Sequence, residues 1–271
     1  MKTTFITAAA LATLAAPVFA DAHAAPATGM GLSADGSQIT MFPGLMEAGD
    51  TLDLTGGTLD AIAYRPVTGD VVGFSKEGGV YGVNLETGEL TSMEATMGDD
   101  VMMGGDAAVG FDFNNAIDAV RAVSTDGVNL VYFPKDFGDD KANSVRRFTD
   151  LAYAEGDMNV GATPEIFANA YTNAVDGAKA SSTAQFALDA GTDALVTLAN
   201  NAGTLETVAP ITVDGNSVDI TSMGGFEIVS SAEGENMAYA LLTIGDSAGI
   251  YGINLETGEA TMMADAGMGG F

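Results

Sequence analysis

The chain has 271 residues, of which 47% are hydrophobic, and its 37 acidic and 9 basic side chains give a formal net charge of −28. Nucleic acid and anionic lipid surfaces repel so acidic a protein, so both are excluded as partners. The apolar content is too high for a disordered chain, and the length suffices for one large β domain or two small ones.

The residue types that are missing also exclude several functions. The chain has no Cys and no Trp, and its single His is His23, close to the N-terminus. Zinc sites built from Cys and His, nucleophilic triads and histidine general bases are therefore absent from the rest of the chain. Most hydrolase chemistries need one of these groups, so the composition favours a binding or structural role.

The N-terminus has the three-part layout of a secretory signal peptide. Met1 and Lys2 supply a positive charge, residues 3–18 are apolar or small, and small residues precede Ala20 and Ala24. We therefore predict a signal peptide over residues 1–24, cleaved after Ala20 or Ala24, and a periplasmic or extracellular protein. No later segment approaches the roughly 18 apolar residues that a membrane helix needs, so we expect no membrane insertion.

The first half of the mature chain alternates between short apolar segments and turns. Four strands are expected at residues 59–64, 70–74, 80–84 and 89–93. Gly69 and Gly88 fit the left-handed position that closes a three-residue hairpin loop with a bulge. The pattern predicts one antiparallel meander of four strands.

This unit recurs along the chain. Residues 250–259 (IYGINLETGE) repeat residues 80–89 (VYGVNLETGE) almost letter for letter, after strands expected at 225–229 and 237–243. Two diverged units lie between, with strands expected at residues 109–113, 119–123, 129–133 and 144–148, and at 166–172, 184–188, 194–198 and 205–208.

Four-stranded sheets that recur about every 40 to 50 residues are typical of a β-propeller. Four units are clear, and residues 28–32 and 38–42 are expected to form part of a fifth, completed by strands from elsewhere in the chain. The sequence thus predicts an all-β, β-propeller-like fold with about five blades of four-stranded antiparallel sheet. A β-sandwich with one duplicated hairpin is the alternative.

The chain resembles a family of exported bacterial proteins, the domain of unknown function DUF4394. The resemblance covers nearly all of residues 25–271, which it implies to be a single propeller-like domain, and it implies no activity. It rests on residues 59–69 (LDAIAYRPVTG), 110–114 (GFDFN), 156–159 (GDMN), 170–173 (AYTN) and the last YGINLETG block. The chain departs from the family pattern at Asn115, where relatives tend to have proline, and after Asn129, where they have an arginine.

The densest set of polar residues within apolar strands comprises Asp112, Asn114, Asp118, Arg121 and Asn129. Strand alternation places Asp112 and Asn114 on one face and the adjacent phenylalanines on the other. One interpretation is a ligand-binding pocket near the propeller axis, with Arg121 as the orienting cation. The other is a structural network between blades, in which Asp112 or Asp118 pairs with Arg121.

Asp136, Asp139 and Asp140 lie in a loop that contains a glycine and is flanked by Lys135 and Lys141. Oxygen ligands in such a loop suit calcium, so these aspartates are the candidate metal ligands, although their spacing does not match an EF-hand. A solvated turn is the alternative.

Methionine is unusually frequent, with 14 residues, including Met102, Met103, Met262 and Met263. Thioethers can bind Cu(I), but flexible filling of the core also accounts for methionine.

The sequence as a whole predicts an exported, acidic β-propeller that acts as a binding or structural module for a protein, glycan or small molecule. The alternative is a carboxylate-based hydrolase that depends on a divalent cation, with calcium as the possible cofactor.

Overall fold

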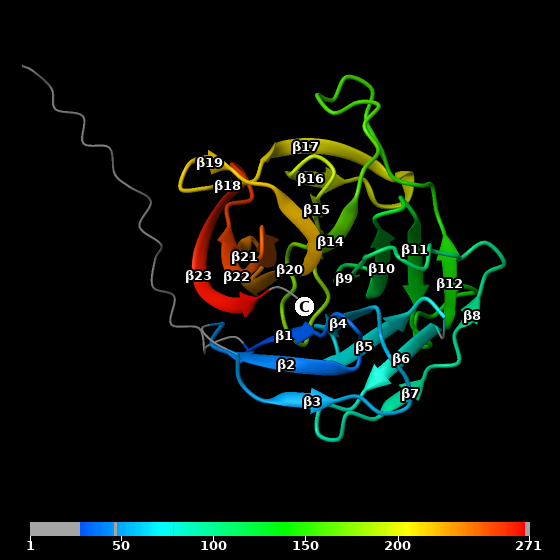
Figure 1. The fold of residues 1–271 in the computed structure, drawn as a ribbon. Helices are drawn as coiled ribbons and strands as arrows, with labels where there is room; N and C mark the ends of the chain where they lie inside the picture. The colour runs from blue at the N-terminus through cyan, green and yellow to red at the C-terminus, as the bar shows by residue number, and fades with distance from the viewer. Residues whose placement is uncertain (1–27, 46–47, 78, 269–271) are drawn as a thin grey trace, which may run out of the picture.

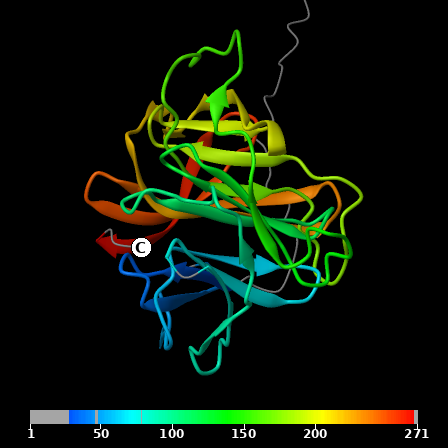
Figure 2. The ribbon, with the colours of Figure 1, turned by 90° about the vertical axis from the view of Figure 1, so that its right-hand side faces the viewer.

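The computed structural model describes residues 28–45, 48–77 and 79–268, and within them it is an all-β protein. Five small sheets lie around a common axis, as Figures 1 and 2 show from two sides. The fold is thus a five-bladed β-propeller, as predicted. The predicted signal peptide lies outside the described residues.

Each blade begins at the axis and proceeds outward in chain order (Figure 1). The first contains β1 (Thr28–Leu32), β2 (Gln38–Pro43) and β3 (Thr51–Asp53). The second contains β4 (Ala61–Arg65), β5 (Asp70–Ser75), β6 (Gly79–Val83) and β7 (Leu90–Ser92). The third contains β9 (Val109–Asn114), β10 (Ala119–Ser124), β11 (Asn129–Phe133) and β12 (Ser144–Arg147).

The fourth blade contains β14 (Ile166–Tyr171), β15 (Gln185–Asp189), β16 (Ala194–Leu198) and β17 (Thr204–Pro210). The fifth contains β20 (Ile220–Ala232), β21 (Glu235–Ile244), β22 (Ser247–Ile253) and β23 (Glu259–Met268). The two copies of the sequence repeat form the β6–β7 and β22–β23 hairpins, which are the third and fourth strands of their blades.

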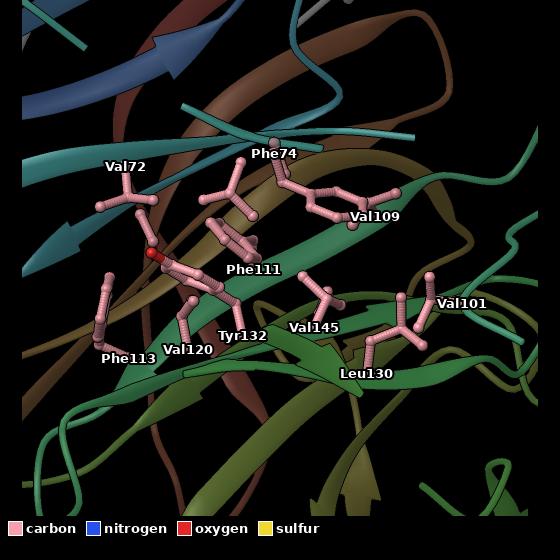
Figure 3. Packing of buried hydrophobic residues seen from close by; sticks show 14 of the residues in the cluster. Val72, Phe74, Val101, Val109, Phe111, Phe113, Val120, Leu130, Tyr132 and Val145 are labelled. Atoms are coloured by element: carbon pink, nitrogen blue, oxygen red, sulfur yellow. The ribbon is translucent and has the colours of Figure 1, made fainter. Parts of the chain in front are cut away.

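The blades pack face to face through apolar side chains that alternate along each strand. Between the second and third blades, Phe74 of β5 and Phe111 of β9 have ring centroids 5.6 Å apart. Val120, Leu130 and Tyr132 pack around them, as Figure 3 shows. Because side chains alternate between the two faces, the other face of the third blade is free to carry Asp112 and Arg121 toward the fourth blade.

The segments that link successive blades extend the sheets at their outer edges. β8 (Thr96–Met97), β13 (Ala152–Tyr153) and β18 (Thr212–Val213) each pair in parallel with the outermost strand of the following blade. At the second blade, a single parallel bridge between Thr55 and Glu89 joins the preceding segment to the outer edge of the sheet. β18 also forms a short hairpin with β19 (Asn216–Ser217). These linkers cover strand edges that would otherwise be unpaired.

Turn glycines permit this close approach of the linkers. Gly69 and Gly88 have φ of 80° and 73°, which confirms the predicted left-handed conformation, although the loop closed by Gly69 has four residues, 66–69, rather than three. A Cβ on Gly88 would lie 1.9 Å from the carbonyl oxygen of Asp53, in the preceding blade. The repeated Thr-Gly turn therefore has a packing role as well as a conformational one.

The ring closes differently from the prediction. Within the described residues, the sheet of the first blade contains only β1, β2 and β3, and no strand from elsewhere in the chain joins it. The last strand, β23, is instead the fourth strand of its own blade. A small apolar cluster of Phe42, Ile250 and Ala264 joins the first blade to the fifth. We call this contact the ring seam.

The part of the chain that the structure describes contains no helix long and apolar enough to span a membrane. Its one helical segment is a 3-10 turn over Asn200–Ala202.

Candidate functional site

A cavity of about 880 Å³ lies along the propeller axis and extends toward the ring seam. The inner strands of all five blades contribute to its wall: β1, β4, β9, β14 and β20. Around the axis, β4, β9, β14 and β20 lie against their neighbours, whereas β1 makes no comparably close approach to β4 or β20 in the described residues. The cavity is within the size range of small-molecule sites in proteins.

Asn169 of β14 is the most informative residue in the cavity wall. Asn169 is 1% exposed, and neither its side-chain oxygen Oδ1 nor its side-chain nitrogen Nδ2 has a hydrogen-bond partner. Buried polar groups in native proteins are nearly always paired, because an unpaired one costs about 1–3 kcal/mol. An unpaired amide at the wall of a cavity is therefore a group ready to bind a ligand.

Two carboxylates of the inner strands, Glu227 and Asp112, have no basic partner in the described residues. Glu227 of β20 lines the cavity, and its Oε1 accepts a hydrogen bond of 2.9 Å from the backbone N–H of Ile228. Asp112 of β9 is 4% exposed, and its Oδ2 accepts a bond of 2.8 Å from the backbone N–H of Tyr171 on β14. Within the described residues, neither carboxylate forms a salt bridge.

Burial shifts the protonation of both groups. Loss of solvation raises the pKa of Glu227 to about 7, although the Ile228 amide opposes the shift. Burial, and then the charge of Glu227, raise the pKa of Asp112 well above its usual range. The two carboxylates interact, so the charge on one favours the protonated form of the other.

The predicted cluster of five polar residues divides among three places. Arg121 and Asn129 lie in a network between the third and fourth blades: the guanidinium donates to Tyr171 Oη at 2.9 Å, to Asn201 Oδ1 at 2.9 Å and to Asn129 Oδ1. Asn129 in turn donates to the Thr149 carbonyl at 2.9 Å. Arg121 thus binds neutral groups, and it does not pair with Asp112 or Asp118 as the network interpretation expected.

Asp118 and Asn114 lie at the β9–β10 turn. Asp118 forms a bidentate pair with Arg65 of the second blade, with N–O distances of 2.8 and 2.6 Å. Asn114 Oδ1 accepts from the backbone N–H of Ala116 and the Thr183 hydroxyl, both at 3.1 Å. Of the five residues, Asp112 is therefore the one coupled to a carboxylate of the cavity wall.

Each of the three candidate metal ligands forms an ion pair with a different basic side chain. Asp136 pairs with Arg65 at 2.8 Å, Asp139 with Lys141, and Asp140 with Arg146 at 3.6 Å. No group of three or more acidic or histidine side chains in the described residues is arranged to hold a metal ion. This geometry favours the interpretation of the loop as a solvated turn.

The methionines are divided between core and surface. Met93, Met97 and Met103 pack against the core between the second and third blades, whereas Met102 is 75% exposed. Met103 thus fills the core, while its neighbour Met102 points to solvent.

Sequence reasoning missed Glu227 and Asn169, although a signal was present. Each is a lone polar residue inside an apolar strand, in Gly-Phe-Glu-Ile-Val and Phe-Ala-Asn-Ala-Tyr, which is the same pattern that marked Asp112. The missing information was that β9, β14 and β20 are neighbours around one axis.

The fold and the cavity define a five-bladed β-propeller with a cavity along its axis. Residues 45–270 match the family described as Domain of unknown function (DUF4394), and the chain belongs to that family. No curated protein matches the sequence.

Solved structures show only remote similarity. An auxiliary nutrient binding protein from Bacteroides thetaiotaomicron is 10% identical, with a TM-score of 0.42 over 78% of this chain and 55% of that one. An extracellular domain described as part of a one-component system from the same species is 12% identical, with a TM-score of 0.39 over 78% of this chain and 25% of that one. This chain thus spans only part of their lengths, and no property of theirs is carried over.

Proposed function

We propose that this protein is an exported binding module that holds a small organic molecule in its axial cavity. The observation that carries the proposal is the buried Asn169 amide, whose donor and acceptor are both unpaired at the wall of a cavity of about 880 Å³. A ligand that hydrogen-bonds this amide would remove the cost of leaving it unpaired. Among the possible partners, a small molecule fits a cavity of this size better than a protein or a large glycan does.

Export is the second part of the proposal. The layout of residues 1–24 supports it, since a charged start, an apolar stretch and small residues before Ala20 and Ala24 are typical of a cleaved leader. The binding site would then operate in the periplasm or outside the cell. N-terminal sequencing of the protein recovered from outside the cytoplasm tests this point, and an intact Met1 there would contradict it.

A variant that fills the cavity tests the binding site. Gly225 lines the cavity, its φ is not positive, and a Cβ there would meet no atom within 4 Å. Gly225→Leu therefore occupies the cavity without a backbone clash. Gly82→Leu is the matched control, because Gly82 is a strand glycine away from the cavity wall and its Cβ would meet only the Thr91 carbonyl oxygen, at 3.9 Å.

The measurement is a thermal melt of the three proteins with a collection of cationic, neutral and anionic organic fragments. A fragment at a hundredfold excess over its Kd adds about 2.7 kcal/mol of stability to a protein that binds it. We expect fragments that stabilise the wild type and Gly82→Leu but not Gly225→Leu. The binding proposal fails if no fragment stabilises the wild type, or if Gly225→Leu responds equally.

One observation favours a hydrolase as a second candidate. Asp112 and Glu227 are carboxylates with raised pKa, and such a group can donate a proton to a leaving group near neutral pH. The sequence alone singled out no such pair. Mass spectrometry of the stabilising fragments after incubation with the protein distinguishes the two functions. A binding module leaves the fragments unchanged, whereas a hydrolase gives cleavage products. Loss of cleavage in a chelator would add the divalent cation to the second candidate.

A further inference from the structure

The wall of the axial cavity is acidic. It contains five carboxylates, from Asp35, Asp60, Asp106, Asp176 and Glu227, and one ammonium group, from Lys76. The ammonium is already satisfied: Lys76 Nζ lies 3.1 Å from Asp60 Oδ1 and donates to the carbonyl oxygens of Gly105 at 2.8 Å and Ala107 at 2.6 Å. In the described residues of the wall, no basic group is therefore left to bind an anion.

Five aromatic residues line the cavity together with its carboxylates. Phe111, Phe167 and Phe226 come from β9, β14 and β20, and Tyr64 and Tyr239 come from β4 and β21. A cation is attracted by the faces of such rings, and more strongly where water is excluded. The rings also provide apolar surface, which a bare or hydrated metal ion would leave uncovered.

Asn169 supplies an observation that does not depend on charge. Its free carbonyl oxygen accepts a hydrogen bond, and its free NH₂ group donates to any further polar atom of a ligand. An ammonium group has donors only, so Asn169 Oδ1 and the Glu227 carboxylate are both suitable acceptors for it. The cavity therefore offers acceptors, aromatic faces and negative charge together.

We propose that the ligand of the axial cavity is an organic monocation, a primary or secondary amine with an aromatic or aliphatic body, with Glu227 as its counter-ion and Asn169 as a second acceptor. This inference rests on the proposed function, which it makes more specific. Asp112 is the carboxyl group that interacts with Glu227, and its backbone bond from Tyr171 fixes its position.

The test uses three probes with one phenylethyl frame: 2-phenylethylamine, 2-phenylethanol and 3-phenylpropanoate. Calorimetric titration at pH 8 and low salt compares them on the wild type, Glu227→Gln and Glu206→Gln. Glu206 is an exposed residue on the outer strand β17, so its variant removes one negative charge without touching the cavity. We expect the amine to bind at least tenfold more tightly than the alcohol, and the carboxylate to bind most weakly.

Glu227→Gln should reduce affinity for the amine about tenfold and leave affinity for the alcohol unchanged, while Glu206→Gln should match the wild type. Asp112→Asn, a second variant of the acidic pair, should weaken amine binding by a smaller factor. Amine binding should also weaken as the pH falls from 8 to 5.5, when Glu227 gains a proton. Asp112 on β9 is the group that interacts electrostatically with Glu227, and the other ionisable residues of the cavity wall are Asp35, Asp60, Tyr64, Lys76, Asp106, Asp176 and Tyr239.

The possible failures are distinguishable. If the alcohol or the carboxylate binds as tightly as the amine, the cavity still binds small molecules and the cation inference is overturned. If Glu227→Gln binds the amine like the wild type, the assignment of Glu227 as counter-ion is overturned. If none of the three probes binds and no fragment stabilises the protein, the proposed function itself is contradicted.

Discussion

At the scale of single residues, the most unusual feature is a carboxylate that is kept in a poorly solvated cavity without a cation. The folded state raises the pKa of Glu227 to about 7, above the value of 4.5 for an ordinary glutamate. The folded protein therefore binds this proton more tightly than the unfolded chain does. The resulting stabilisation is present below about pH 4.5 and is lost as the pH rises through 7.

Glu227→Gln removes this contribution of Glu227 to the pH dependence of stability. Between pH 4.5 and 8, the wild type should lose about 2–3 kcal/mol in its free energy of unfolding relative to the variant, with no ligand present. Denaturant unfolding of both proteins across this range measures the difference, in which the titrating groups that do not interact with Glu227 cancel. Parallel curves for the two proteins would mean that Glu227 is ordinarily solvated.

The Arg65–Asp118 pair is a second test at this scale, because it joins the second blade to the third. Both side chains are only 9% exposed, so Asp118→Asn leaves a buried guanidinium with a partly exposed partner, Asp136. Asparagine tolerates the left-handed φ of 58° at this position. We expect a loss of about 2–4 kcal/mol in denaturant unfolding.

The control for this pair is Asp150→Asn, which breaks the exposed Arg147–Asp150 pair. Exposed pairs contribute about 0–1 kcal/mol, so the control should unfold almost like the wild type. Equal losses in the two variants would show that Arg65 and Asp118 do not form a buried pair in solution.

At the scale of elements, the repeated Asn-Leu-Glu-Thr-Gly turn supports the linker between blades. Asn84 Oδ1 accepts from the backbone N–H groups of Glu86 and Thr87, at 2.9 and 3.1 Å, and Asn254 does the same at 2.9 and 3.1 Å in the other copy. The carbonyl of the turn glycine then accepts from the linker, from Thr55 at 2.8 Å at the second blade. The repeated segment thus has two structural roles: it forms the turn, and the carbonyl of its glycine binds the linker.

Gly88→Ala separates these two constraints. A methyl group there has both a positive φ and a contact at 1.9 Å with the Asp53 carbonyl, whereas Gly215→Ala has a positive φ of 75° and open space. Gly215→Ala should lower the free energy of unfolding by about 1–2 kcal/mol, which is typical of an alanine in the left-handed conformation. Gly88→Ala should cost clearly more in thermal unfolding, and equal costs would contradict the linker contact.

Sequence periodicity predicted most of the blade strands, but neither β3 and the linker strands β8, β13, β18 and β19 nor the candidate site. The strands around Val109, Ala119 and Asn129 were expected within one or two residues of their bounds, because apolar segments and turn glycines mark them locally. Strand alternation grouped Asp112 with Asn114, whereas Arg121, expected to pair with Asp112 or Asp118, bonds to the neighbouring blade. Which inner strands meet at the axis depends on ring closure, and nothing local in the sequence encodes it.

At the scale of the whole molecule, the five blades are not joined equally. Among the described residues, extensive apolar clusters join the second blade to the third and the fourth to the fifth, whereas the cluster at the ring seam is smaller and contains Phe42, Ile250, Ala264 and a few partly buried neighbours. The cavity extends toward the ring seam, with Phe42 and Ile250 in its wall. A ligand in the cavity therefore adds contacts across the seam.

Hydrogen exchange should show that the blades differ in local stability. Without ligand, the amides of β1 and β2 should exchange faster than those of β9, β10 and β11, because local opening follows the number of buried apolar contacts. A bound amine should slow exchange in β1 and β20 selectively. Uniform protection of all five blades in the free protein would contradict a weak seam.

The central claim is that the axial cavity is a ligand site, and the most direct test is a crystal structure of the protein grown with 2-phenylethylamine. The account predicts electron density for the amine within the ring of inner strands, with its nitrogen within hydrogen-bond distance of the Glu227 carboxylate and its ring against the aromatic wall. A cavity that contains only water, while the amine lies elsewhere or is absent, would contradict the account.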